Sequence, residues 1–285
     1  MARRCSTADS LADIGGKHIC FELYYIHEVT IMNEYLKNAN RIEFVITLAC
    51  TGKCKHCSEG DHIGCSEHID TDTAVKTVRA LCENYDITSL MTFGGEPLLY
   101  PDTVCAIHSE ATKLNITHRQ LITNGYFSKD YKKIEETAAR LVNAGINDLL
   151  LSVDAFHQET IPLAPVKHFA ECLRETPISV RFSPAWLVSR EDDNPYNNRT
   201  REILRELDYL GFPTGEGNVI FPSGNAIKYL SEYLGDTTKE YSPYEEDPTD
   251  IRSFSFGPDG SVDMLGGNIY TDDILKLAEA YIPKR

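Results

Sequence analysis

The sequence predicts an α/β fold built on a parallel sheet with helices outside it. From residue 41 onward, short β-branched or apolar runs alternate six times with runs of helical periodicity. Such alternation is typical of parallel strands joined by crossover helices. The chain has 285 residues, of which 42% are hydrophobic, so it is long enough for one sizeable core with short additions.

The predicted elements follow in a regular order. Strands are expected at 41–47, 89–93, 118–123, 148–153, 178–183 and 218–221, and helices at 72–84, 102–114, 129–144, 164–175 and 199–210. Pro101 directly precedes the second helix, and Gly145 and Gly211 end the third and fifth. The run 148–153 is the most continuously apolar, as expected of a strand buried on both faces.

Two segments lie outside this alternation. Residues 1–40 form an N-terminal extension. Near the other end, Phe254 and Phe256 lead into a Pro-Asp-Gly turn that predicts a hairpin, and Thr271 is expected to cap a final helix. We therefore expect three parts: the extension at 1–40, the main fold at 41–222, and a linker with a hairpin and helix at 223–285.

Composition limits the partners and the compartment. The formal net charge of −15 disfavours a nucleic-acid substrate, which normally requires a basic face. No apolar run reaches the ~20 residues of a membrane span, and the first residues lack a signal-peptide core. A cytoplasmic protein is expected. Three of the nine cysteines fall within eight residues, which indicates a metal or redox site rather than a disulfide framework.

Those three cysteines lie on the loop after the first predicted strand. Cys50, Cys54 and Cys57 can bind three irons of a 4Fe–4S cube and leave the fourth iron open. Gly52 eases the tight path of the chain around such a cluster. The alternative is a zinc site that combines these cysteines with His56, His62, Cys65 or His68, in a non-catalytic scaffold.

A second motif, Gly94–Gly95–Glu96–Pro97, ends the next predicted strand about forty residues later. The carboxyl ends of parallel strands are where α/β sheets bind ligands. C-x3-C-x2-C after a strand, followed by this motif, resembles the radical S-adenosylmethionine (SAM) superfamily over about 41–222. The resemblance implies a partial (β/α)6 TIM-like barrel, a 4Fe–4S cluster on the cysteines, and SAM held by its amino group at Gly94–Pro97. His56 takes a place that is typically aromatic in the family.

The other strand ends carry further candidate SAM contacts. They are Asn124 after the third strand, Ser152 and Asp154 after the fourth, Arg181 on the fifth and Val219 on the sixth. The resemblance implies that Ser152 and Asp154 lie near the ribose and carboxylate of SAM. Arg181 is a candidate to pair with that carboxylate, and Val219 to pack on adenine. The alternatives are a plain turn at Asn124, a helix cap at Asp154 and a core position for Val219.

The resemblance also implies the chemistry, which is reductive cleavage of SAM to a 5′-deoxyadenosyl radical that abstracts hydrogen from a substrate. The C-terminal hairpin and helix resemble a degenerate twitch/SPASM extension, which predicts a ribosomally made peptide as substrate. No cysteine follows Cys172, so this tail cannot bind an auxiliary cluster. The alternative substrate is a small metabolite or nucleotide. Flavodoxin or ferredoxin is the expected electron donor, and Cys65, Tyr126 and His157 are candidates for catalytic groups.

Overall fold

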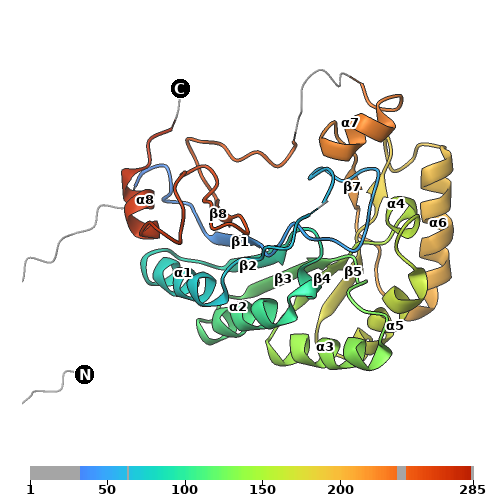
Figure 1. Cartoon of the computed structure of the whole chain (residues 1–285), viewed down its shortest axis with the longest axis horizontal. Coiled ribbons are helices and arrows are strands. Elements are labelled where there is room, and N and C mark those ends of the chain that lie inside the picture. The colour runs from blue at the N-terminus through green and yellow to red at the C-terminus, as the bar shows by residue number, and fades with distance from the viewer. Residues whose placement is uncertain (1–32, 63, 236–241, 284–285) are drawn as a thin grey trace, which may run out of the picture. The chain divides into compact units, whose positions relative to one another are not determined.

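The computed structural model describes residues 33–62, 64–235 and 242–283, and it contains a six-stranded parallel sheet (Figure 1). The sheet order is β5-β4-β3-β2-β1-β8. Its strands are β1 (Arg41–Val45), β2 (Ser89–Phe93), β3 (His118–Thr123), β4 (Asp148–Leu151), β5 (Ser179–Phe182) and β8 (Ser253–Phe256). Most of the predicted extension at 1–40 lies outside the described residues.

The helices are α1 (Thr71–Asn84), α2 (Pro101–Lys113), α3 (Tyr131–Asn143), α4 (Ala155–Gln158), α5 (Leu163–Leu173), α6 (Pro195–Leu207), α7 (Gly224–Leu230) and α8 (Ile274–Ala280). Figure 1 shows α1, α2 and α3 along one face of the sheet. Polar side chains cap the N-termini of several helices. At the start of α1, the Asp70 carboxylate accepts a hydrogen bond from the Thr73 backbone N–H. No helix in the described ranges is long and apolar enough to cross a membrane.

The first five predicted strands and the alternating α/β order are confirmed. The sixth predicted strand is not part of the six-stranded sheet: β7 (Asn218–Val219) instead pairs in parallel with the short β6 (Ala185–Trp186). Pro184 interrupts the strand after β5 because proline has no backbone N–H for a ladder. The Phe182 N–H still donates to Pro213 and the Ile220 N–H to Trp186, so residues 213–220 continue the strand order beyond β5.

The sixth strand of the main sheet comes from the C-terminal segment. Phe254 and Phe256 of β8 pair in parallel with β1, and the aromatic rings of Phe256 and Phe44 stack at 5.0 Å. The predicted hairpin turn follows, closed by a hydrogen bond from the Gly257 N–H to the Ser261 carbonyl. The predicted cap of the last helix was wrong, because Asp273, and not Thr271, accepts the Leu275 N–H at the start of α8.

The two faces of the sheet differ in chemistry. Ile42, Phe44, Leu90 and Leu121 point to the helix side and are fully buried. Along β1 to β4 the opposite face changes from polar to apolar toward the carboxyl ends, with Met91 in the middle of β2, whereas β5 and β8 carry the polar Arg181 and Ser255 on this face. The polar members are Arg41, Glu43, Ser89, His118, Gln120 and Asp148, and the apolar ones are Val45, Phe93, Ile122 and Leu150. All strands run parallel, so their carboxyl ends form one rim beyond the apolar band.

Candidate functional site

The cysteine loop, which carries Cys50, Cys54 and Cys57, begins where β1 ends and packs against the end of β2. The Gly95 N–H donates to the Thr47 carbonyl and the Glu96 N–H to the Ala49 carbonyl, each at 2.8 Å. The Thr47 hydroxyl donates to the Glu67 carbonyl at 2.6 Å and accepts the Ala49 N–H at 3.0 Å. The two sequence motifs are therefore one structural unit, joined by backbone hydrogen bonds.

Gly95 allows this close approach because it lacks a side chain. A Cβ at this position would lie 2.3 Å from the Ala49 carbonyl oxygen and 2.7 Å from that of Leu48. Both obstacles are backbone atoms, which cannot rotate away as the end of a side chain can. The contact between the Gly94–Pro97 segment and the loop thus requires glycine here.

A Gly95→Ala substitution is expected to push the loop off the end of β2 and lower the free energy of unfolding by about 1–3 kcal/mol, as overpacking of a tight interior does. Urea titration of the metal-free protein measures this. Gly235→Ala is the matched control, since no atom of the described residues lies within 4 Å of a Cβ built there. Equal stability of the two variants would contradict the docking argument.

The three thiols of the cysteine loop differ in exposure. Cys54 is only 7% exposed, whereas Cys50 and Cys57 are partly exposed. Burial raises the pKa of Cys50 to about 11, and burial also raises the pKa of Cys54, with Asp154, Cys50 and Cys57 adding to the effect. Soft thiolates together are the usual ligands of iron–sulfur clusters.

Polar groups surround the thiols in a way that suits a sulfur-rich centre. The Gly52 N–H lies 3.3 Å from the Cys50 sulfur, and the Asn124 amide nitrogen lies 3.6 Å from the same atom. His62 Nε2 lies 3.2 Å from the Cys57 sulfur. Hydrogen bonds to ligand sulfur atoms are one of the means by which proteins set cluster potentials. The residues present therefore fit a cluster of this kind.

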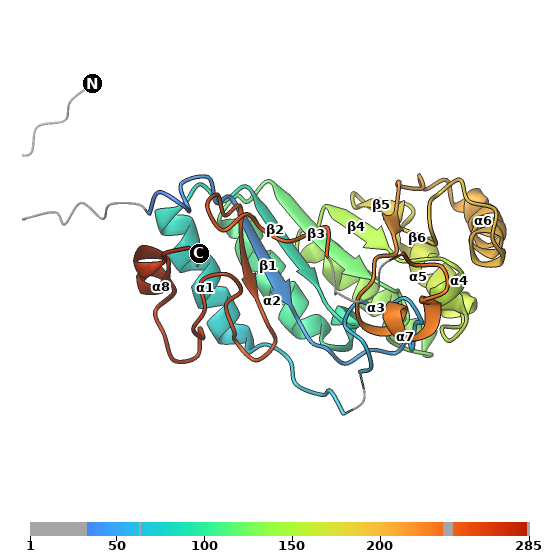
Figure 2. The same ribbon diagram turned by 90° about the horizontal axis from the view of Figure 1, so that it is seen from above.

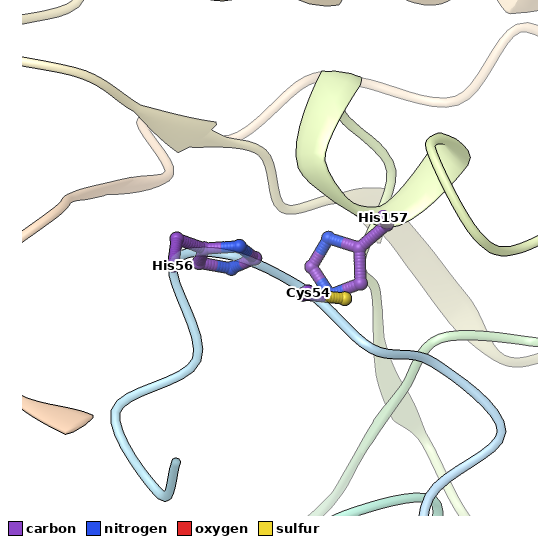
Figure 3. A group of neighbouring side chains, drawn as sticks. All are labelled: Cys54, His56 and His157. Carbon is purple, nitrogen blue, oxygen red and sulfur yellow. The ribbon is translucent and has the colours of Figure 1, made fainter. Parts of the chain in front are cut away.

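A second group lies at the same loop, and it has the ligand types of a zinc site. One ligand atom each of Cys54, His56 and His157 lies within 4.8 Å of the others. Figure 3 shows the ring of His157, from α4, beside the Cys54 sulfur, with His56 on the loop. The zinc alternative therefore has geometric support, although from His157 rather than from His62, Cys65 or His68.

Glu96 ties the ends of two strands together. Its buried carboxylate accepts the Leu98 N–H at 2.9 Å, the Thr123 hydroxyl at 2.7 Å and the Asn124 N–H at 2.9 Å. Burial raises the pKa of Glu96 to about 7, although these hydrogen bonds act in the opposite direction. The carboxylate therefore holds Asn124 in place at the rim.

Asp154 and His157 form a buried pair at the start of α4. The Asp154 carboxylate caps the helix by accepting the His157 N–H at 2.9 Å, and it also accepts His157 Nδ1 at 2.8 Å and the Ala185 N–H at 2.9 Å. Burial acts to raise the pKa of Asp154, but the charge and hydrogen bonds of His157 hold it well below its usual range. Asp154 raises the pKa of His157 in turn, against the effect of burial. The helix-cap alternative for Asp154 is thus confirmed.

The remaining predicted residues are distributed between the rim and the sheet face opposite to α1, α2 and α3, which we call the open face. Ser152 follows β4 at the rim, where its N–H donates to the Thr123 carbonyl. Tyr126 is partly buried and its N–H donates to the Asn124 side chain. Val219 is 47% exposed on β7, so the core alternative for it is wrong. Cys65 lies farther along the loop, and its N–H donates to the His62 carbonyl.

Arg181 points toward the start of the strands. Its guanidinium donates to Asp148, the first residue of β4, at 2.8 Å. The same carboxylate oxygen of Asp148 also contacts His118 Nε2 at 2.9 Å and the Gln120 amide at 2.5 Å. This polar cluster on the open face was not predicted, because its members lie on three separate strands, β3, β4 and β5. A contact of Arg181 with SAM stays a prediction.

Comparison with known proteins gives partial sequence matches. Residues 44–181 match the family model of the Radical SAM superfamily. GTP 3′,8-cyclase of Rippkaea orientalis is 29% identical over 115 residues, 39% of this chain and 33% of that protein. A probable GTP 3′,8-cyclase of Saccharolobus islandicus is 24% identical over 208 residues, 68% of this chain and 64% of that protein. The matches thus span less than two thirds of these relatives.

Solved structures share the fold at lower identity. Streptococcus suis SuiB bound to the precursor peptide SuiA has a TM-score of 0.57 at 11% identity, over 88% of this chain and 66% of that one. The enzyme anSMEcpe with bound AdoMet (SAM) has a TM-score of 0.56 at 15% identity, over 84% of this chain and 79% of that one. The radical SAM fold binds a 4Fe–4S cluster and SAM. Residues 44–181 thus match the Radical SAM family model, and the chain shares its fold with these two structures.

Proposed function

We propose that the protein is a radical SAM enzyme that binds its 4Fe–4S cluster through Cys50, Cys54 and Cys57. The observation that carries this proposal is the docking of the cysteine loop on Gly95 and Glu96, which joins the three-cysteine motif to the carboxyl end of β2 by backbone hydrogen bonds. When bound, the cluster and SAM supply a 5′-deoxyadenosyl radical by reductive cleavage, and this radical removes a hydrogen atom from the substrate. The protein itself binds, orients and shields the reactants.

The rim residues have defined parts in this proposal. The Gly94–Pro97 segment holds the amino group of SAM, and Asn124 stands beside it because Glu96 fixes its backbone. Ser152 lies nearest the ribose. Val219 offers the exposed apolar surface on which adenine packs. The Asp154 carboxylate accepts three hydrogen bonds from protein donors, and its contribution is to fix the start of α4 next to the loop.

The open face of the sheet supports a substrate that is apolar near the rim and polar farther from it. Three residues of the apolar band, Val45, Phe93 and Leu150, lie within two residues of the carboxyl ends of their strands. Each strand residue spans about 3.3 Å, so these side chains are close to the rim. An aliphatic C–H group on this band sits closest to where the radical is generated. Glu43 and Asp148 lie deeper on the same face and suit polar groups. A peptide that lays one apolar side chain on the band meets both requirements.

A peptide substrate is further supported by the shared fold with SuiB and with anSMEcpe, which was also solved with a peptide. A nucleotide is the second candidate, and its support is the sequence match to GTP 3′,8-cyclases. Arg41 and Arg181 on the open face are the groups that would meet its phosphates.

The test is anaerobic reconstitution with iron and sulfide, reduction by dithionite or by flavodoxin or ferredoxin, and chromatographic assay of 5′-deoxyadenosine. Short peptides and nucleoside triphosphates, deuterated at their aliphatic and ribose positions, are added in parallel. Deuterium in 5′-deoxyadenosine from peptides only supports the leading proposal, and deuterium from GTP only supports the second. Uptake of zinc in place of an iron–sulfur cluster would show the metal scaffold and overturn both.

A further inference from the structure

The segment Ser223–Asn225, at the start of α7, packs against the second half of the cysteine loop. This segment is more than 160 residues away in the sequence, yet Figure 2 shows α7 beside the loop that follows β1. Asn225 is only 6% exposed. It plays no part in the strand ends described above, so its burial there needs a separate explanation.

Asn225 binds the loop through both its backbone and its side chain. Its backbone N–H donates to the Cys57 carbonyl at 2.8 Å. Its side-chain amide donates to the Gly60 carbonyl at 3.1 Å and to the Cys54 carbonyl at 3.3 Å. One residue therefore holds the carbonyl groups of two of the three predicted cluster ligands.

The neighbours of Asn225 enforce the same contact. The Ser223 hydroxyl donates to the Ser58 carbonyl at 3.1 Å. Gly224 has a φ of +51°, and a Cβ there would lie 2.3 Å from the Ser58 carbonyl oxygen and 2.6 Å from that of Cys57. Glycine thus lets the start of α7 sit directly on the loop backbone.

The helix that carries Asn225 is itself firmly held. Ala226 and Leu230 of α7 are fully buried in a second core that includes Phe156, Leu187 and Ile220. The ring of Phe156 lies 5.1 Å from that of His56 on the loop. The Lys228–Asp61 ion pair is about half exposed at both ends and adds little stability. The buried contacts therefore make α7 a fixed support for the loop.

We propose that Asn225 is a positioning residue for the iron–sulfur cluster, which fixes the backbone of Cys54 and Cys57 so that their thiols keep the spacing the cluster needs. The proposal rests on the cluster ligands assigned under Proposed function. Groups that orient metal ligands commonly change metal affinity 10–100-fold when removed. A loop held in place before metal arrives also loses iron more slowly, because a released thiolate stays near the iron.

The test compares Asn225→Ala and Asn225→Asp with Asn197→Ala in the reconstituted full-length protein. Asn197 is a matched control: it is fully buried, and its amide donates to the carbonyls of Leu187, Ser189 and Asp192, away from the cysteine loop. Asn225→Asp keeps the shape of the side chain but places a carboxylate oxygen against the Cys54 and Gly60 carbonyls. The readouts are the rate of iron transfer to a chelator, the electron paramagnetic resonance spectrum of the reduced cluster, and urea unfolding of the metal-free protein.

We expect both Asn225 variants to lose iron about tenfold faster than the wild type and to show an altered spectrum. Asn197→Ala is expected to lose comparable stability as metal-free protein but to release iron at the wild-type rate. Iron release from the Asn225 variants that matches either the wild type or Asn197→Ala would overturn the proposal. If the wild type takes up zinc alone, the cluster assignment fails, and zinc release from the same variants then decides whether Asn225 positions the loop for that metal.

Discussion

Replacing Cys54 with alanine is expected to abolish both iron–sulfur uptake and 5′-deoxyadenosine production. Cys54 is the most buried of the three loop cysteines. Two remaining thiolates can bind only two of the three irons, so the cube lacks a protein ligand at the third. Iron and sulfide analysis, the visible spectrum and chromatography of 5′-deoxyadenosine measure the result.

Cys82→Ala is the control for this experiment. Cys82 is a free, partly buried cysteine of α1 that packs against the main hydrophobic core. The control is expected to take up a full cluster and to cleave SAM at the wild-type rate. A Cys54→Ala protein that still binds about four irons and makes 5′-deoxyadenosine would refute the ligand assignment.

The parts of the fold that sequence predicts well are those whose signal is local. The strands at 89–93 and 118–123 are predicted to the residue, because short runs of alternating or apolar residues end in Gly94–Gly95 or in Asn124–Gly125. The pairing of β8 with β1 has no local signal, since Phe254 and Ile42 are partners across most of the chain. The misplaced cap of α8 has a different cause: Thr271 and Asp273 are both good caps, and only the turn geometry decides between them.

The residues of the site also divide into those with a local sequence signal and those without one. The three cysteines lie within eight residues of one loop, so their spacing in the sequence is enough to group them. The Gly94–Pro97 motif is found by its position after a strand. The direction of a side chain is not encoded locally. Arg181 turns to Asp148, a carboxylate that His118 and Gln120 of the neighbouring strand also contact. The role of Asn225 is not predicted from the sequence for a similar reason, since only folding brings its partners on the loop next to it.

Asp154→Asn is expected to destabilise the metal-free protein by about 3–5 kcal/mol, the typical cost of breaking a buried ion pair by removing one partner. Asp154 is fully buried, and it accepts hydrogen bonds from the backbone N–H and ring Nδ1 of His157 and from the Ala185 N–H. Asparagine keeps the size of the side chain but removes the negative charge. His157, whose pKa the carboxylate raises, is then left either as a buried cation without a counter-ion or as a neutral ring with a weaker acceptor.

Urea titration at constant pH measures this loss, with Asp130→Asn as its matched control. Asp130 also caps a helix, accepting the Lys132 N–H at the start of α3, but it is exposed and its carboxylate faces no histidine. The control is expected to lose no more than about 1 kcal/mol, as exposed helix caps do. Equal losses in the two variants would show that Asp154 acts only as a helix cap. A larger loss at Asp154 means instead that the ion pair fixes α4, and with it His157, against the Cys54 side of the cysteine loop.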